Sequence, residues 1–257
     1  MKLLATLTGL FLCFCMNAQV DPLLPKVYTW DAGKIGPPHP NFIEKKIFNG
    51  SGAKLSQHEM KGIIVPEGKT INYAADTNGP ERFFIVRKGP VTVQLLQKQY
   101  SIDRGSVILL LPGDALLISN KDNEDAVLYE MSYRSIAVAD AERGKKAGSS
   151  FVMNWNDMVF KPTDKGGVRQ LFDRQTNMFN RFDIHVTQLN EGFKSHDPHT
   201  HANEEIILML DGNAEMQIGT DHQKANPGDV VFLSSLVLHN LTNVGKTACL
   251  YFAIQWN

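Results

Sequence analysis

Three histidines and one glutamate in the second half of the chain have the types and spacing of a metal site. His199 and His201 stand two residues apart, Glu205 follows four residues later, and His239 comes after a later apolar run. In an extended segment, residues i and i+2 point to the same side, so the first two imidazoles can face one cavity. Three imidazoles and a carboxylate suit Mn, Fe, Co, Ni or Zn better than Ca or Mg. The sequence therefore predicts one divalent transition-metal ion held by these four side chains.

An internal repeat indicates the elements that position this site. Adding 123 to each residue number places residues 82–89 on 205–212 and Gly105 on Gly228. The same offset relates Asn120 to Asn243, Tyr129 to Phe252, and Tyr133 to Trp256. Chance matching of glycines and apolar residues is the alternative explanation. The repeat predicts two copies of one unit, at 60–135 and 181–257, with an N-terminal arm at 19–59 and a linker at 136–180.

Each copy contains short β-rich segments that are separated by turn signals rich in Gly, Pro, Asn and Asp, a pattern typical of a sandwich or barrel. In the first copy the expected strands are 63–65, 82–86, 91–95, 107–111 and 126–133. In the second copy they are 182–189, 205–210, 214–218, 230–233 and 248–256. We expect one helix within the linker, at 137–146, and an arm rich in Pro and Gly that wraps the surface.

The motifs resemble those of the cupin superfamily. His-x-His, three residues, Glu, six residues and Gly212 match its first motif, and Gly228, His239 and Asn243 match its second. Two such units imply an all-β bicupin with two tandem jelly-roll barrels. The first copy has Asp76, Asn78, Arg82 and Leu116 at the corresponding positions. Arginine is a cation and leucine is not a ligand, so we expect no metal site in the N-terminal unit.

Within bicupins the chain most resembles the (S)-ureidoglycine aminohydrolase group, through residues 79–86 and 181–186. That resemblance implies Mn as the metal and a small ureide carboxylate as the substrate. The group has a glutamate as first ligand and a glutamine as last, where this chain has His199 and His239. We therefore expect a metal-dependent enzyme, of hydrolase or isomerase type, for a small polar carboxylate-bearing substrate that is ureide-like or sugar-acid-like. An iron-dependent dioxygenase is also a metal-dependent enzyme of this kind. The alternatives to an enzyme are a non-catalytic ligand-binding cupin and a storage bicupin.

Other side chains near the motif can contribute to catalysis or substrate binding. We assign His185 as the catalytic general base, because its strand is expected to run beside the His-x-His segment, although a hydrogen-bonded core histidine fits as well. His196 and Asp197 lie on the loop that enters the motif and can contact substrate or solvent. Three arginines near the start of the second unit can bind a carboxylate or take surface roles: Arg169, Arg174 and Arg181.

The net charge and the N-terminal residues limit which partners and which cellular location are expected. The 26 basic and 27 acidic residues provide no positive field for nucleic acid. The apolar run that follows Lys2 predicts a signal peptide at 1–18 and an exported protein, periplasmic or secreted, which the intact mass of the mature chain would test. The run is too short to span a membrane. Cys13 and Cys15 leave a lipid anchor as the alternative, and Cys249 then remains as a packing residue. A small-molecule substrate is the expected partner, and a homo-oligomer is compatible with the sequence.

Overall fold

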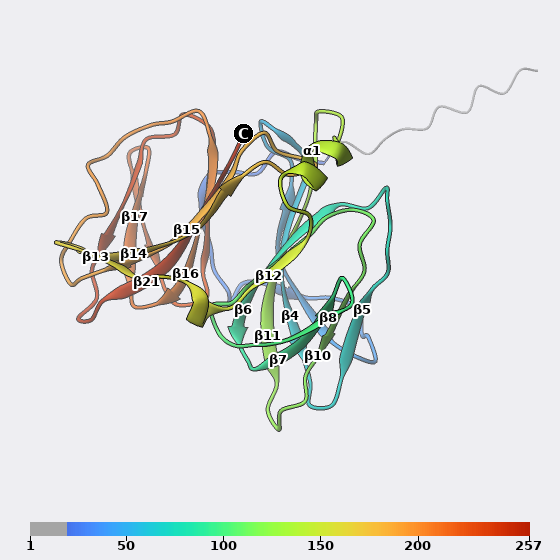
Figure 1. Ribbon diagram of the computed structural model, residues 1–257. Coiled ribbons are helices and arrows are strands. Elements are labelled where there is room, and N and C mark those ends of the chain that lie inside the picture. Colours follow the sequence, from blue (N-terminus) through green and yellow to red (C-terminus); the bar gives the residue numbers. More distant parts are fainter. Residues whose placement is uncertain (1–19) are drawn as a thin grey trace, which may run out of the picture.

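Two β-barrels lie side by side in the computed structural model, which describes residues 20–257 (Figure 1). The expected signal peptide at 1–18 lies outside the described residues. Within the described part, helical structure is limited to α1 (Ala141–Lys146) and the short 3-10 helix η1 (Trp155–Asp157), so the expected linker helix is present but shorter. None of the helices in residues 20–257 is long and apolar enough to cross a membrane. The all-β class and the two barrels predicted from the sequence are confirmed.

The first barrel combines a seven-stranded and a four-stranded sheet. The larger sheet contains, in spatial order, β12 (Phe151–Met153), β9 (Val107–Leu110), β6 (Glu81–Lys88), β11 (Ala126–Ser135), β4 (Leu55–Val65), β3 (Ile43–Gly50) and β2 (Lys34–Ile35). The smaller sheet contains β5 (Thr70–Tyr73), β10 (Leu116–Ser119), β7 (Val91–Leu95) and β8 (Lys98–Ile102). All the strand pairs are antiparallel.

The second barrel combines a seven-stranded and a three-stranded sheet. The larger contains β1 (Lys26–Tyr28), β19 (Val230–Leu233), β16 (Glu204–Asp211), β21 (Cys249–Trp256), β15 (Phe182–Leu189), β14 (Gly166–Arg174) and β13 (Lys161–Thr163). The smaller contains β18 (Asp221–Ala225), β17 (Ala214–Ile218) and β20 (His239–Asn243). The bounds of β7, β8 and β9 fall on those of β17, β18 and β19 after an offset of 123. The repeat inferred from the sequence is therefore a repeat of structure.

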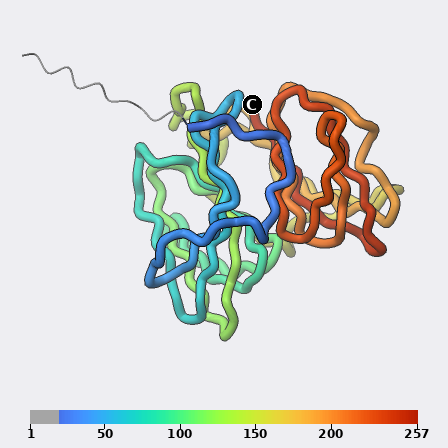
Figure 2. The backbone as a smooth tube through the Cα atoms, turned by 180° about the vertical axis from the view of Figure 1, so that it is seen from behind, coloured from blue at the N-terminus to red at the C-terminus, as the bar shows by residue number. Residues whose placement is uncertain are grey.

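The predicted arm and linker are not simple connectors. Strands β3 and β4 begin before residue 60 and pair with each other in the first barrel. Strand β1 pairs with β19 of the second barrel, and Figure 2 shows the N-terminal segment, in blue, crossing to that barrel and returning. Strands β13 and β14, from the predicted linker, extend the second sheet beside β15. These segments form strands, contrary to the expectation, because the edge of a sheet has unpaired backbone N–H and C=O groups. Adjacent segments of the chain pair with these groups.

The two large sheets face each other and enclose the main apolar core between the barrels. On β16, Ile206 and Leu208 point into this shared core, whereas Ile207 and Met209 point into their own barrel. Because successive residues of a strand point to opposite faces, a strand with two buried faces is apolar along its whole length. Residues 206–210 are all buried for this reason.

A buried glutamate at the start of each equivalent strand binds a connecting segment of the other barrel, between β3 and β4 or between β14 and β15. Glu204 of β16 accepts hydrogen bonds from the backbone N–H groups of Ala53 (2.8 Å) and Lys54 (3.3 Å), and from the indole of Trp256 (3.3 Å). Its repeat partner Glu81 accepts from the hydroxyl of Tyr133 (2.5 Å). The backbone N–H of Met178 also donates to Glu81, at 3.3 Å. The two carboxylates thus form related contacts on the two sides of the interface.

Replacing Glu204 with alanine should lower the free energy of unfolding by about 2 kcal/mol, because the buried indole of Trp256 and two partly buried backbone N–H groups lose their acceptor. Denaturant unfolding at neutral pH measures this loss. Glu215→Ala provides the control, since Glu215 is a half-exposed glutamate whose removal should change stability by less than about 0.5 kcal/mol. A Glu204→Ala variant as stable as the control would show that this contact does not stabilise the pair of barrels.

Candidate metal centre

The four predicted ligands come from three places in the chain that the second barrel brings together. His199 and His201 lie in the loop before β16, Glu205 is the second residue of β16, and His239 is the first residue of β20. The backbones of His199 and His239 form a β-bridge, with N–H to carbonyl distances of 3.2 and 3.0 Å. The backbone N–H of Leu236 donates to the carbonyl of His201 at 2.8 Å. Backbone pairing therefore holds the ligand loops in register before any ion binds.

The side chains converge as the sequence predicts. One ring nitrogen from each of His199, His201 and His239 lies within 4.8 Å of the other two. The Oε2 atom of Glu205 is 3.4 Å from Nε2 of His201 and 3.3 Å from Nε2 of His239. The structure thus places three imidazoles and one carboxylate around a common point.

The hydrogen bonds of two ligands show that this arrangement fits a cation. His201 Nδ1 is 2.9 Å from the carbonyl oxygen of Asn203, and His239 Nδ1 is 2.9 Å from that of Val237. A carbonyl only accepts, so Nδ1 carries the proton in both rings and Nε2 of the neutral ring presents a lone pair. Both Nε2 atoms are buried without a hydrogen-bond partner. Two such lone pairs that face a carboxylate need positive charge between them, which a divalent metal ion, or protons on the two rings in its absence, can supply.

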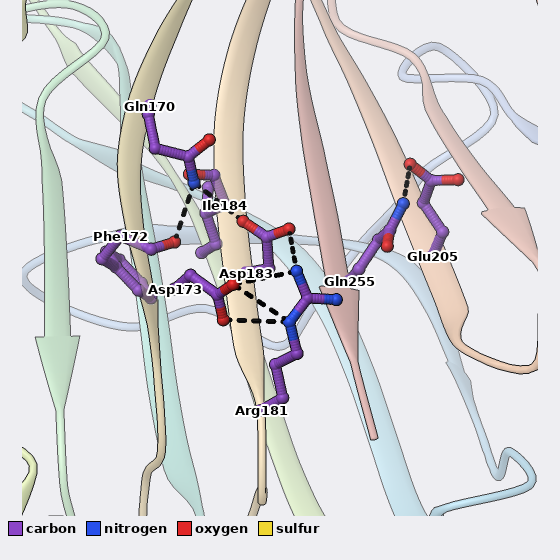
Figure 3. Close-up of polar contacts among 8 residues, drawn as sticks. All are labelled: Gln170, Phe172, Asp173, Arg181, Asp183, Ile184, Glu205 and Gln255. Carbon is purple, nitrogen blue, oxygen red and sulfur yellow. Dashed lines mark hydrogen bonds and ion pairs between the residues drawn. The ribbon is translucent and has the colours of Figure 1, made fainter.

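Glu205 remains ionised although it is buried. Burial raises the pKa of a carboxyl group, but without a metal ion the hydrogen bonds from protonated Nε2 atoms of His201 and His239 outweigh burial and lower the pKa of Glu205 to about 2. The side-chain amide of Gln255 donates to Oε1 of Glu205 at 3.2 Å (Figure 3). Gln255 therefore orients the carboxylate and leaves Oε2 directed at the imidazoles.

The first barrel has an ion pair at the corresponding place. Arg82 occupies the position of Glu205, and its Nε donates to Oε1 of the buried Glu130 at 2.9 Å. The hydroxyl of Tyr73 donates to the other oxygen of Glu130 at 2.8 Å. Leu116 occupies the position of His239. The guanidinium of Arg82 thus neutralises the carboxylate of Glu130. Arg82 and Leu116 do not provide the candidate metal-binding side chains found at the equivalent positions of the second barrel.

A cavity of about 560 Å³ adjoins the ligands inside the second barrel. His185 and His196 contribute to its lining together with His199, Glu205 and His239. The ring of His196 stands edge-on to that of His199, with centroids 4.1 Å apart, so the loop histidine lies beside the ligands. A cavity of this volume, next to a cluster of ligands, has the size of a small-molecule site.

The structure corrects the expected surroundings of His185. Its strand, β15, pairs with β14 and β21 and does not run beside the His-x-His segment, because β21 lies between β15 and β16. His185 nevertheless lines the cavity, since it lies on the face of β15 that points into the barrel. Its assignment as the general base stays a prediction.

The three arginines considered as carboxylate ligands do not line the cavity. Arg181 donates to Asp173 and Asp183, at 2.9 and 2.8 Å, as Figure 3 shows. Arg169 stacks on the rings of Trp155 and Phe160. Arg174 donates to the backbone carbonyls of Ser149 and Gly144. Their charges are used in ion pairs, aromatic stacking and backbone contacts.

Two residues of the site were not anticipated from the sequence. Gln255 shares a face of β21 with Ala253 and Tyr251, and the period of two in that strand is the signal that would have found it. Lys165 lines the cavity from the turn between β13 and β14, and its Nζ donates to the carbonyl of Ser195 at 3.1 Å. No local pattern marks Lys165, because its place depends on a hairpin that joins the barrel from the predicted linker.

Comparison with protein families finds one match, which lies in the second barrel. Residues 185–255 match a family model described as Cupin domain. This stretch contains all four converging side chains and strands β16 to β21. The second barrel is thus similar to a cupin domain over residues 185–255. The cupin resemblance inferred from the motifs is therefore confirmed for this part of the chain, whereas the resemblance to the (S)-ureidoglycine aminohydrolase group stays a prediction.

Solved structures show the same fold over most of the chain. AerE from Microcystis aeruginosa has a TM-score of 0.66 and 12% identity, covering 88% of this chain and 97% of AerE. Oxalate decarboxylase from Lactobacillus farciminis, in its formate complex, has a TM-score of 0.69 and 12% identity, covering 91% and 87%. Vicilin from Corylus avellana (hazelnut) has a TM-score of 0.65 and 8% identity, covering 91% and 86%. Comparison with curated proteins found no match. The structural likeness shows a bicupin fold.

Proposed function

We propose that the second barrel is the active centre of a metal-dependent enzyme that acts on a carboxylate-bearing small molecule. The observation that carries the proposal is the pair of buried Nε2 lone pairs, on His201 and His239, that face the carboxylate of Glu205. The cavity beside them offers space for a substrate. A divalent ion held there would act as a Lewis acid for an oxygen of the substrate.

Mn is the metal that we propose, on the resemblance to the (S)-ureidoglycine aminohydrolase group, and Fe, Co, Ni and Zn accept similar ligands. Four protein ligands leave two positions of an octahedron, which suit a carboxylate and a neighbouring oxygen or nitrogen. The oxalate decarboxylase of like fold was solved with formate, which is itself a carboxylate. Vicilin has the same fold, so the ligand set rather than the fold favours an enzyme.

The protein's own residues would orient the substrate and move protons. Gln255 fixes Glu205, and His185 is our candidate for the general base because it lines the same cavity. A general base contributes about 10²- to 10⁴-fold to a rate. His185 is not among the grouped ligand histidines, so its removal should leave metal binding intact.

A panel of hydroxy acids, amino acids, ureides and uronates, given to the metal-loaded protein, tests the proposal. We expect turnover of at least one compound that stops when the metal is removed. His185→Ala should then lower kcat about 100-fold or more at unchanged metal content, while His222→Ala, an exposed histidine on β18, should leave kcat unchanged. Tight binding without metal-dependent turnover would contradict the proposed enzyme and favour a ligand-binding cupin. A fully active His185→Ala variant would remove only the role of His185.

A further inference from the structure

We infer that the substrate carries an apolar group of several carbons, which the second barrel buries beyond the metal centre. This inference rests on the proposed function, because it takes the carboxylate of the substrate to bind at the ligand cluster. The inference adds the chemical nature of the part of the substrate that lies beyond the carboxylate. A 2-hydroxy or 2-oxo acid with an alkyl or aromatic side chain is such a compound.

The cavity extends along the barrel away from the ligands. Glu205 and Gln255 are direct cross-strand partners and form the row of residues at the ligands. The next row on the same face contains Ile207 and Ala253, and Tyr251 lies one row beyond. Alternate residues of a strand are about 7 Å apart, so these rows extend about 13 Å into the barrel. All five residues line the one cavity.

Several side chains in the inner part of this cavity are apolar, although His185 stands beside Ala253 and Thr187 beside Tyr251 on the neighbouring strand β15. Leu189, Met216 and Leu241 line it, and each is 2% exposed or less. The hydroxyl of Tyr251 adds a further polar atom. A fully polar substrate that filled this part would place hydroxyl or amide groups against apolar side chains, which costs free energy. An apolar group makes favourable contacts there instead.

The first barrel shows what the same positions look like when they are filled. Phe84 and Glu130 are cross-strand partners at the places that Ile207 and Ala253 take in the second barrel. Phe84 is buried in a closed apolar cluster and packs against Tyr73, with ring centroids 5.1 Å apart. The second barrel thus has smaller side chains at both positions.

An unfilled apolar cavity lowers the stability of a protein, and the loss grows with the cavity volume. Protein interiors are otherwise packed as densely as organic crystals. The smaller side chains at these two positions, together with the cavity beside them, therefore indicate space for a ligand. A volume of about 560 Å³ exceeds what a carboxylate with one or two carbons fills, and it lies within the range of sites for larger ligands.

Calorimetric titration of the Mn-loaded protein with straight-chain 2-hydroxy acids, from lactate to 2-hydroxyoctanoate, tests the inference. Each added methylene should lower Kd about fourfold, as expected for burial of one CH₂ group, until the cavity is full. A parallel series of 1-alkanols tests the cavity without a carboxylate. Affinity that rises with chain length for the alkanols but not for the acids would overturn the proposed carboxylate site and leave the apolar site in place. No rise with chain length in either series would overturn this inference.

Ile207→Phe places the residue of the first barrel into the cavity and provides a matched variant. It should remove the gain from chain length, so that 2-hydroxyoctanoate binds at least about tenfold more weakly than to the unchanged protein, at unchanged metal content. Met216→Phe, from the facing sheet, is the second variant should the first fail to fold. Undiminished binding of the long acid by a folded variant of either kind would contradict the inference.

Discussion

Replacing His201 with alanine should reduce bound transition metal from about one ion per chain to less than a tenth of that. Its Nε2 is a buried lone pair that faces Glu205, 3.4 Å away, and its ring orientation is fixed by the carbonyl of Asn203. Alanine supplies no ligand, and even the loss of a group that only orients a ligand weakens metal binding about 10- to 100-fold. Metal analysis of protein purified without added metal measures the effect.

The same substitution should lower stability, because an ion that binds the folded chain shifts the folding equilibrium toward it. With free metal at about 1,000 times Kd the contribution is about 4 kcal/mol. A chelator should therefore lower the Tm of the unchanged protein and have little effect on His201→Ala. His222→Ala is the control, since His222 is exposed and lies outside the cluster. Unchanged metal content in His201→Ala, or about two ions per chain in the unchanged protein, would contradict the single site.

His58 should make the protein sensitive to acid. The side chain is fully buried between the barrels, its two ring nitrogens have no hydrogen-bond partner, and burial lowers its pKa from 6.5 to about 3. It contacts the aromatic rings of Phe48, Phe232 and Trp256, with centroids 5.1, 5.9 and 5.1 Å away. The folded state therefore holds the neutral ring, whereas the unfolded chain binds a proton below pH 6.5.

This difference sets the sign and the size of the pH effect. The contribution of His58 to stability is complete above the unfolded pKa of 6.5 and is lost as the pH falls toward the folded pKa of about 3. The full loss amounts to about 5 kcal/mol, of which about 3 kcal/mol is reached at pH 4. Unfolding by denaturant at a series of pH values measures the slope.

His58→Leu removes the titrating group and keeps an apolar side chain of similar size. Its stability at pH 7 should stay within about 1.5 kcal/mol of the unchanged protein. The difference in stability between the variant and the unchanged protein should shift by about 3 kcal/mol in favour of the variant when the pH is lowered from 7 to 4. His222→Leu, at an exposed position, should show no such gain. Parallel pH profiles for His58→Leu and the unchanged protein would show that His58 is not the acid-sensitive group.

Much of the fold was predictable because its signals are local. Turn residues bound β7, β15, β17 and β19, whose expected limits coincide with those in the structure. The repeated glycines, Gly105 and Gly228, have φ values of 84° and 101°, a conformation that favours glycine at the same turn of each unit. The missed strands, such as β8 and β18, are short and largely polar, so they lack the apolar pattern that marks a strand.

The convergence of the four candidate ligands was also predictable, since residue type and spacing decide which side chains could share a metal. The depth of the cavity was not, because it depends on the residues that face one another across strands far apart in sequence. Ile207 and Ala253 leave space only because β16 pairs with β21 in a register that sets them side by side. The same register turns Glu205 into the barrel and Glu204 into the interface.

The sequence by itself determined the two β-rich units, the apolar strands and the four side chains able to bind a metal. Periodicity and spacing carry this information, because they depend on neighbouring residues along the chain. Only the tertiary structure decided that β1 joins the second barrel, that the hairpin of Lys165 lines the cavity, and that His185 shares it. These placements depend on pairing between distant segments, in which each strand edge selects its neighbour by backbone hydrogen bonds and by the apolar surface that it buries.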